Sequence, residues 1–177
     1  MRVITGTARG RRLKEPANYD IRPTTGQVKE AMFNICQGDV EGRRVLDLFG
    51  GTGQLGIEAK SRGAAEVTIV DSGKAAVELI RENVRRTGLE IHVIRGDALG
   101  FLQRGGAYDL IFLDPPYGSG LAEKALGAIK SFDKLSIGGI IICETEAFSA
   151  LPEAEPPYLR LREYRYGKVK LTTYTKR

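Results

Sequence analysis

The feature that most constrains how this chain folds is a strand-like run that turns through glycines into a helix. The run Arg44-Val-Leu-Asp-Leu48 leads through Phe49-Gly-Gly-Thr-Gly-Gln54 into a helical pattern. Short apolar runs of the same kind recur at 66–71, 91–94, 108–113 and 138–144. Alternation of such runs with helical patterns predicts an α/β fold with a mostly parallel sheet, buried on both faces.

The C-terminal part of the chain follows a different pattern. Residues 159–165 alternate between apolar and polar, and the chain turns and returns through 169–174. This pattern predicts an antiparallel hairpin that closes the sheet. The length suits one domain. We therefore expect a single domain over residues 1–177, with an N-terminal extension (1–40) and a core (41–177).

The N-terminal extension is rich in arginine and glycine. Its first residues form two short extended pieces around glycines, which predicts a small basic β-hairpin or arm. A helix is predicted from about Gln27 to Cys36, and either Thr24 or Thr25 can cap its start.

The segment Asp114-Pro-Pro-Tyr117 follows the buried-looking run that ends at Leu113. Ligands of open α/β sheets bind beyond the carboxyl ends of the strands, where this loop is expected. The two prolines stiffen the backbone and supply no N–H, so the carboxylate of Asp114 and the carbonyl of Pro115 act as acceptors. Acceptors beside the ring of Tyr117 suit an amino group on a flat heterocycle. A tight turn with a capping aspartate is the alternative interpretation.

Carboxylates follow or end the neighbouring predicted strands. Asp71 ends the second strand, 24 residues after Asp47, where an acid can accept both hydroxyls of a ribose. Ser72 is expected to cap the next helix. Asp97, after the third strand, could face an adenine amino group, and Asp47 could bind a cationic amino-acid group.

The glycine turn also matches a dinucleotide fingerprint. Gly51-Thr-Gly-Gln-Leu-Gly56 fits G-x-G-x-x-G, and Asp71 stands where the NAD pattern places an acid. Three features oppose NAD: Asp47 precedes the turn, the 114–117 loop has no role in hydride transfer, and an antiparallel hairpin replaces the sixth parallel strand.

The charge is unevenly distributed along the chain. Residues 1–30 carry a balance of +4 and residues 158–177 a balance of +6, whereas residues 31–157 carry −5. Basic ends on a mildly acidic middle favour a polyanionic partner, and nucleic acid in particular.

The cysteines, the single histidine and the hydropathy of the chain argue against a disulfide, a metal site and a membrane span. Cys36 and Cys143 lie far apart within apolar patterns, which indicates buried thiols. With the single His92 we expect no metal site. No apolar run approaches the roughly 18 residues of a membrane span, and the start has no signal-peptide pattern. We therefore expect a cytoplasmic protein without membrane contact.

The combined motifs resemble a known family. The general motifs resemble those of S-adenosylmethionine-dependent amino-methyltransferases: Asp47-x-Phe49-x-Gly51-Thr52-Gly53, Asp71, Asp97 and Asp114-Pro-Pro-Tyr117. Narrower segments resemble the RsmD family: Gly6-x6-Leu13, Arg22-Pro-Thr-Thr25 with Val28-Lys-Glu-Ala-Met-Phe-Asn34, and Tyr166-Gly-Lys168. That family methylates N2 of one guanine in bacterial small-subunit (16S) ribosomal RNA. The resemblance covers essentially the whole chain and implies a Rossmann-like S-adenosylmethionine methyltransferase fold with a seven-stranded sheet.

The resemblance implies a role for particular residues. The expected cofactor-binding residues are Asp47, Phe49, Gly51, Thr52, Gly53, Asp71, Ser72, Asp97, Ala98 and Asp114. The expected catalytic residues are Asp114, Pro115, Pro116 and Tyr117. The RNA-binding residues are expected from the basic ends of the chain and not from the resemblance, and they are Arg9, Arg11, Arg12, Arg22, Thr24, Thr25 and Lys168. Gly50 and Gln54 occupy places where the family is expected to have mostly alanine.

Two other functions remain open on the sequence. A DNA adenine-N6 methyltransferase could use the same Asp-Pro-Pro-Tyr chemistry, although no long insertion offers a target-recognition domain. A non-catalytic RNA-binding or ribosome-assembly protein could keep the fold alone. The expected partner is ribosomal RNA or a small ribosomal subunit, and the sequence leaves open whether the substrate is naked RNA, an assembly intermediate or the finished subunit. The expected oligomeric state is a monomer.

Overall fold

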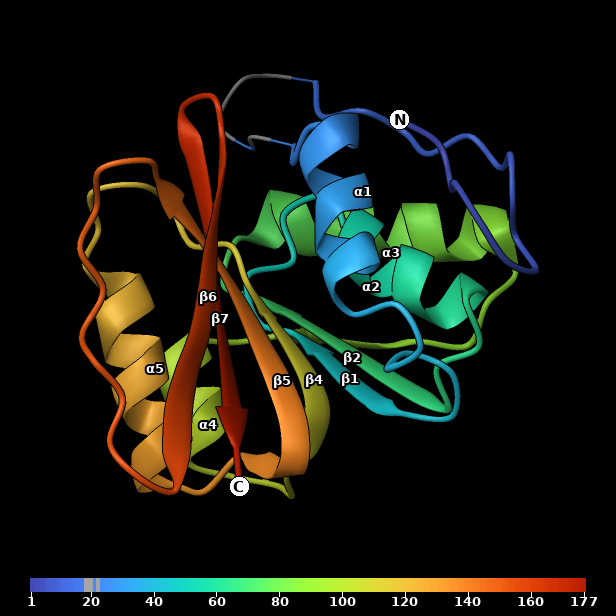
Figure 1. The fold of residues 1–177 in the computed structure, drawn as a ribbon. Coiled ribbons are helices and arrows are strands. Elements are labelled where there is room, and N and C mark those ends of the chain that lie inside the picture. The colour runs from blue at the N-terminus through green and yellow to red at the C-terminus, as the bar shows by residue number, and fades with distance from the viewer. Residues whose placement is uncertain (18–20, 22) are drawn as a thin grey trace.

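The structure, a computed structural model, describes residues 1–17, 21 and 23–177 (Figure 1). The helices of this described part are α1 (Gly26–Ile35), α2 (Gln54–Ser61), α3 (Lys74–Thr87), α4 (Ala98–Leu102) and α5 (Leu121–Ser131). The strands are β1 (Arg44–Asp47), β2 (Glu66–Asp71), β3 (His92–Arg95), β4 (Tyr108–Leu113), β5 (Leu135–Glu146), β6 (Tyr158–Tyr166) and β7 (Val169–Lys176).

The strands form one seven-stranded sheet in the order β3-β2-β1-β4-β5-β7-β6. β1 pairs in parallel with β2 on one side and with β4 on the other, and β3 and β5 extend the parallel part. β7 runs antiparallel to β5, and β6 runs antiparallel to β7. The prediction of a mostly parallel, Rossmann-like sheet closed by an antiparallel C-terminal hairpin is confirmed.

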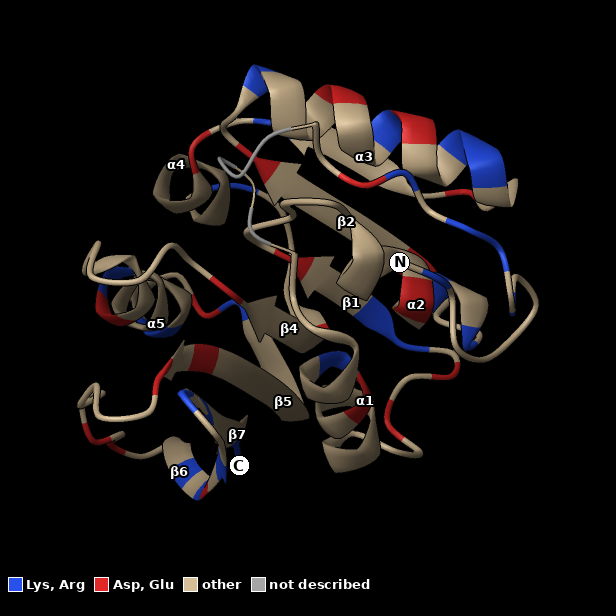
Figure 2. Ribbon diagram, turned by 90° about the horizontal axis from the view of Figure 1, so that it is seen from above, with Lys and Arg blue, Asp and Glu red and all other residues tan. Residues whose placement is uncertain are grey.

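Helices cover both faces of the sheet. α1, α2 and α3 pack on one face, and α4 and α5 pack on the other (Figure 2). In β4, Leu110 and Phe112 belong to the first core and Ile111 and Leu113 to the second, and all are 0% exposed. Successive side chains of a strand point to opposite faces, so a strand covered on both sides must be apolar throughout. Full burial of each such side chain contributes about 1.5–3 kcal/mol.

A buried carboxylate holds the N-terminal segment against α2. Glu58, 0% exposed, accepts hydrogen bonds from the backbone N–H groups of Ile4 (2.8 Å) and Thr5 (2.9 Å). Its oxygens also lie 3.4 Å from the ammonium of Lys29 and 3.0 Å from the guanidinium of Arg62. Cations and N–H groups together offset the desolvation of the buried charge. The segment is therefore fixed to the body of the protein.

The ends of some elements differ from the sequence expectations. The N-terminal hairpin is confirmed only as a single antiparallel bridge, between Arg2 and Arg12. Thr25 caps α1 and accepts a hydrogen bond from the Val28 N–H at 3.4 Å. β5 begins at Leu135, before the predicted position 138, and its pairing with β4 is irregular there.

The prediction that Ser72 caps the third helix is wrong. The N-cap of α3 is Gly73, which has an extended backbone and no side-chain cap. Instead of a side-chain cap on the helix, the structure has a turn just before it, in which Oδ1 of Asp71 accepts a hydrogen bond from the Gly73 N–H at 2.8 Å.

Candidate active site

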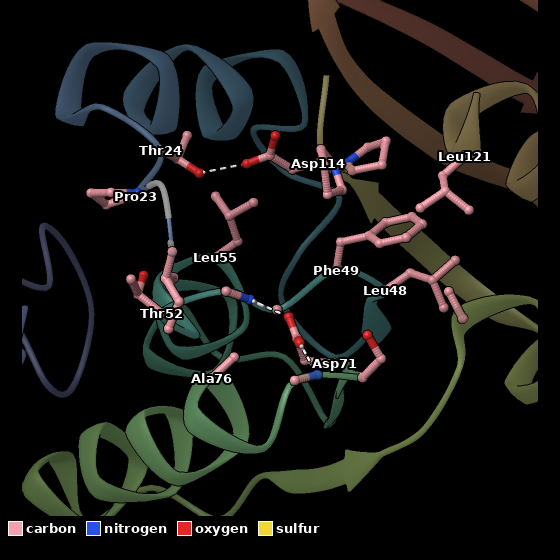
Figure 3. A pocket seen from close by; sticks show the side chains of 18 of the residues that line it. Pro23, Thr24, Leu48, Phe49, Thr52, Leu55, Asp71, Ala76, Asp114 and Leu121 are labelled. Atoms are coloured by element: carbon pink, nitrogen blue, oxygen red, sulfur yellow. Dashed lines mark hydrogen bonds between the residues drawn. The ribbon is translucent and has the colours of Figure 1, made fainter. Parts of the chain in front are cut away.

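A cavity of about 620 Å³ opens beside the carboxyl ends of the parallel strands (Figure 3). Its wall combines the loop before α1, the glycine turn after β1, the start of α3, the β3–α4 connection and the loop after β4. Cavities that bind small molecules typically measure about 300–1,000 Å³. The cavity therefore has the size and the place expected of a ligand site in an open α/β sheet.

Most of the predicted site residues line this cavity. They are Thr24, Phe49, Gly51, Thr52, Asp71, Ser72, Asp97, Ala98, Asp114, Pro115, Pro116 and Tyr117. The other described predictions lie outside its lining: Arg9, Arg11, Arg12, Thr25, Asp47, Gly53 and Lys168. Arg22 lies outside the described residues.

Asp71 fixes the glycine turn to the start of α3. Its Oδ2 accepts a hydrogen bond from the Gly51 N–H at 2.9 Å, while Oδ1 accepts from the Gly73 N–H (Figure 3). Gly51 and Gly53 have φ angles of 57° and 79°, a region that favours glycine. Each carboxylate oxygen can accept more than one hydrogen bond, so Asp71 retains acceptor capacity toward the cavity.

Asp97 also has a structural role. It is the N-cap of α4, and its Oδ2 accepts a hydrogen bond from the Gly100 N–H at 2.8 Å. The residue is exposed and lines the cavity beside Ala98. A carboxylate in this position can accept a further hydrogen bond from a ligand.

Asp47 is a buried carboxylate beneath the glycine turn. It is 1% exposed, and its Oδ2 accepts a hydrogen bond from the Gly56 N–H at 3.0 Å. Its buried Oδ1 has no hydrogen-bond partner among the described residues. Burial, reinforced by the neighbouring carboxylates of Asp114 and Asp71, raises the pKa of Asp47 to about 8. A cation near Oδ1 would favour the charged form.

The loop after β4 is tied to the N-terminal loop through its aspartate. The hydroxyl of Thr24 donates a hydrogen bond to Oδ2 of Asp114 at 2.8 Å (Figure 3). The side-chain amide of Gln54, the first residue of α2, donates to the carbonyl of Thr24 at 2.6 Å. Three segments that are distant in sequence therefore set the orientation of the Asp114 carboxylate.

Tyr117 is held by a second carboxylate. Its hydroxyl donates a hydrogen bond to Oε1 of Glu144 at 2.8 Å. Glu144 lies near the end of β5, is 5% exposed and also lines the cavity. This contact fixes the direction of the Tyr117 ring at the cavity wall.

The described residues offer neither a metal cluster nor a membrane helix. No group of three or more His, Cys, Asp or Glu within residues 1–17, 21 and 23–177 is arranged to hold a metal ion. In the same part of the chain, no helix combines the length and the apolar character that a membrane crossing requires. His92 is exposed on β3, and Cys36 and Cys143 are buried free thiols, as predicted.

Comparison with known proteins identifies the family. Residues 1–175 match the sequence model of the family described as Conserved hypothetical protein 95. The ribosomal RNA small subunit methyltransferase D of Escherichia coli (strain K12) is 32% identical over 176 residues, which cover 98% of this chain and 89% of that protein. The chain belongs to the RsmD family.

Further relatives agree with the RsmD family assignment. The YlbH protein of Bacillus subtilis (strain 168), which is described as a proposed rRNA methyltransferase, is 38% identical over 183 residues. The alignment covers 100% of both chains. The solved structure of yhhF from Escherichia coli, described as a proposed methyltransferase, superposes with a TM-score of 0.90 at 30% identity, covering 99% of this chain and 97% of that one. The methyltransferase fold implied by the sequence motifs is confirmed.

The structure explains two departures from the expected RsmD family pattern. A Cβ atom on Gly50 would lie 2.4 Å from Cγ2 of Ile69 and 2.8 Å from Cδ1 of Ile80. The two isoleucines therefore fill the space that an alanine methyl would need. Gln54 makes the hydrogen bond to the Thr24 carbonyl, which an alanine could not make.

Sequence reasoning missed Glu144 and the contacts of Thr24 and Gln54. Glu144 falls at the end of the predicted fifth strand, where a carboxylate reaches the same edge of the sheet as Asp71. That position is a signal that could have identified it. The Thr24 and Gln54 contacts connect residues that are 90 and 30 positions apart in sequence, and no local pattern indicates them.

Proposed function

We propose that this RsmD family protein transfers a methyl group from S-adenosylmethionine to the exocyclic N2 of a guanine in small-subunit ribosomal RNA. The observation that carries the proposal is the Asp114 carboxylate on the cavity wall, oriented by the Thr24 hydroxyl and adjacent to Tyr117. The Escherichia coli relative is named for ribosomal RNA of the small subunit, which supports the same class of substrate here.

The residues of the cavity fit S-adenosylmethionine. Asp71 and Asp97 offer carboxylate acceptors at the ends of β2 and β3, suited to ribose hydroxyls and to an adenine amino group. Asp47 lies outside the cavity lining, buried beneath the glycine turn, and from there its carboxylate can attract the cationic amino-acid end of the cofactor. When bound, the cofactor supplies a sulfonium methyl group that is already a strong electrophile.

The residues after β4 act on the nucleophile. The lone pair of a guanine amino group is delocalised into the ring, so the amine is a poor nucleophile. The Asp114 carboxylate and the Pro115 carbonyl accept its hydrogens, which localises the lone pair and stabilises the positive charge that develops on nitrogen. Tyr117, held by Glu144, stacks on the base and keeps the amino group at the acceptors.

The basic ends of the chain bind the phosphates around the target. Arg9, Arg11 and Arg12 are exposed on the N-terminal segment, and Lys168 is exposed in the β6–β7 turn. Lys and Arg recur along both of these segments (Figure 2). Because a guanine must leave its stack to enter the cavity, phosphate contacts hold the rest of the RNA while the base is extruded. We propose that the protein acts in this way as a single-domain cytoplasmic monomer.

The test is transfer of a labelled methyl group from S-adenosylmethionine to naked 16S rRNA, to assembled small subunits and to DNA. Wild type is expected to label guanine N2 in rRNA or in subunits, and the better acceptor identifies the natural substrate. Asp114→Asn is expected to lose activity by about 100-fold or more, since it removes a carboxylate that stabilises the transition state. Asp39→Asn is the matched control, because Asp39 is a surface residue whose partner is Arg43.

Two outcomes would contradict the proposal. Label in DNA adenine would keep the catalytic loop but refute the rRNA substrate. Equal support of ribosome assembly by wild type and Asp114→Asn, with no methyl transfer by either protein, would refute catalysis and favour a binding role.

A further inference from the structure

An exposed phenylalanine projects from the turn that follows β5. The side chain of Phe148 is 91% exposed, the largest exposed fraction among the large apolar side chains of the described residues. A whole aromatic ring in contact with solvent lacks the stabilisation that burial of apolar surface provides. Isolated exposed apolar residues are common, so exposure alone indicates no function. The surroundings of Phe148 supply the further argument.

The turn that carries Phe148 is fixed on both sides of the ring. The Ala147 N–H donates to the Lys168 carbonyl at 2.9 Å, and the Ser149 N–H donates to the Glu146 carbonyl at 3.0 Å. The ammonium of Lys170, 4% exposed, donates to the Ser149 carbonyl at 2.6 Å. The backbone is therefore held while the ring points to solvent. A ring presented on a fixed backbone loses little conformational entropy when it binds.

Cations surround the exposed ring. The guanidinium of Arg165 lies 5.7 Å from the ring centroid of Phe148, within the range of a cation–π contact. Lys168 is exposed in the adjoining β6–β7 turn. Residues 158–177, which supply both cations, carry a charge balance of +6. An aromatic face beside cations is complementary to a nucleotide, which has a flat base and a negative phosphate.

The ring lies on the same edge of the sheet as the cavity. Glu144, four positions earlier in the chain, lines the cavity that contains Asp114 and Tyr117. Four residues of extended chain span at most about 14 Å. Figure 1 shows the β6–β7 turn at the upper edge of the molecule, and the hydrogen bond from the Ala147 N–H to the Lys168 carbonyl holds the chain after β5 beside this turn. A nucleotide near the one that enters the cavity can therefore reach Phe148.

We propose that Phe148, assisted by Arg165, is a stacking platform for an unpaired RNA base that flanks the methylated guanine. The inference rests on the proposed function, because RNA is the substrate from which a base is extruded. Extrusion of one base removes a stacking partner from its neighbours, and the platform restores that contact on one side. Stacking accepts any base, so the platform contributes affinity and register without reading the sequence.

The chain contains no tryptophan, which permits a direct test of base stacking. Phe148→Trp places the single tryptophan of the protein on the platform and preserves a flat ring. Titration with naked 16S rRNA is expected to quench its fluorescence, because bases quench a tryptophan on which they stack. Ile137→Trp is the matched control, since Ile137 is 78% exposed near the start of β5, at the opposite end of the strand from Phe148. Its fluorescence is expected to stay unchanged.

Kinetics provides the second measurement. Phe148→Leu keeps an apolar side chain but removes the flat ring, and we expect the KM for RNA to rise about tenfold with kcat nearly unchanged. Phe148→Trp should restore the wild-type KM. Ile137→Leu should match wild type throughout.

Failure of this inference is distinguishable from failure of the proposed function. If wild type methylates rRNA while Phe148→Leu keeps the wild-type KM and Phe148→Trp is not quenched, the platform is refuted and the proposed function stands. If Phe148→Trp is quenched but wild type methylates no RNA, Phe148 stacks on an RNA base, whereas the proposed function and the place of that base beside a methylated guanine are refuted. If Phe148→Leu raises the KM only for assembled subunits and naked rRNA does not quench Phe148→Trp, the ring contacts a ribosomal protein and the platform is refuted.

Discussion

Thr24 shows how a single hydroxyl can connect the N-terminal extension to the chemistry. It orients Asp114 through the 2.8 Å hydrogen bond to Oδ2. Thr24→Val keeps the shape and removes the donor, and hydrogen bonds to charged groups contribute about 1.5–3 kcal/mol. We expect kcat for methyl transfer to fall about tenfold or more, with little change in cofactor affinity. Thr87→Val, which removes a hydroxyl at the far end of α3, is the control and should retain full activity.

Asp47 should make the stability of the cofactor-free protein depend on pH. Its pKa is raised from 3.8 to about 8 in the folded state, mainly by burial. Between these two pKa values the folded protein holds a proton that the unfolded chain has released. The contribution of Asp47 to the free energy of unfolding is therefore most favourable at low pH and is lost as pH rises toward 8. The maximum slope is about 1.4 kcal/mol per pH unit.

Denaturant unfolding of wild type and Asp47→Asn between pH 5 and pH 9 measures this contribution. Asparagine does not titrate, so the difference in unfolding free energy between the two proteins should shift in favour of the variant as pH rises. A difference that stays constant across this range would contradict the raised pKa of Asp47.

At the scale of elements, the docking of the N-terminal segment on α2 depends on a glycine. Gly6 has a φ of 87°, and a Cβ atom there would lie 1.7 Å from the Ser61 carbonyl oxygen. Gly10 has a similar φ of 81°, but nothing lies within 4 Å of its Cβ position. Gly10→Ala should therefore lower the free energy of unfolding only by the backbone strain, about 1–2 kcal/mol. Gly6→Ala adds a steric clash that must displace the N-terminal segment from α2.

Hydrogen exchange separates the two glycine variants. Gly6→Ala should accelerate exchange of the Ile4, Thr5 and Ala8 amides, which bond to side chains of α2. Gly10→Ala should leave these amides protected. Equal protection in both variants would show that the segment tolerates a side chain at position 6.

The elements that sequence predicted best are those with a strong local pattern. β4 and the C-terminal hairpin are fixed by burial on two faces and by alternation, so their bounds are close to the prediction. α4 was missed because a helix of five residues shows no helical periodicity. The cap of α3 was misjudged because the helix begins at Lys74, so that Gly73 and not Ser72 occupies the N-cap position.

The residues of the candidate site also fall into those that a local sequence pattern predicts and those that it does not. Asp71, Asp97 and Asp114 were found because each lies where a parallel strand has just ended, a position visible in the sequence. Sequence did not predict the side-chain contacts of the site. Thr24 bonds Asp114, and Tyr117 bonds Glu144, only when elements that are distant in sequence pack together.

At the scale of the whole molecule, the separation of charge predicts how binding responds to salt. Each Lys or Arg that neutralises an RNA phosphate displaces a counterion, which contributes about 0.7 to the slope of log K against log salt for a single strand. Arg9, Arg11 and Arg12 are exposed on a segment that Glu58 holds in place, so they act as fixed charges. Replacing all three with alanine should reduce the slope by about two and leave cofactor binding intact.

The matched control removes the same number of arginines from a different surface. Arg81, Arg85 and Arg86 are exposed on α3, and Glu82 already pairs with two of them. Their replacement should change the slope by much less, because the overall charge falls equally but no phosphate contact is lost. Equal loss of slope in both triple variants would mean that net charge alone attracts the RNA. A loss confined to the N-terminal triple would show that the extension is a preformed RNA-binding surface, placed by the same fold that brings Thr24 to Asp114.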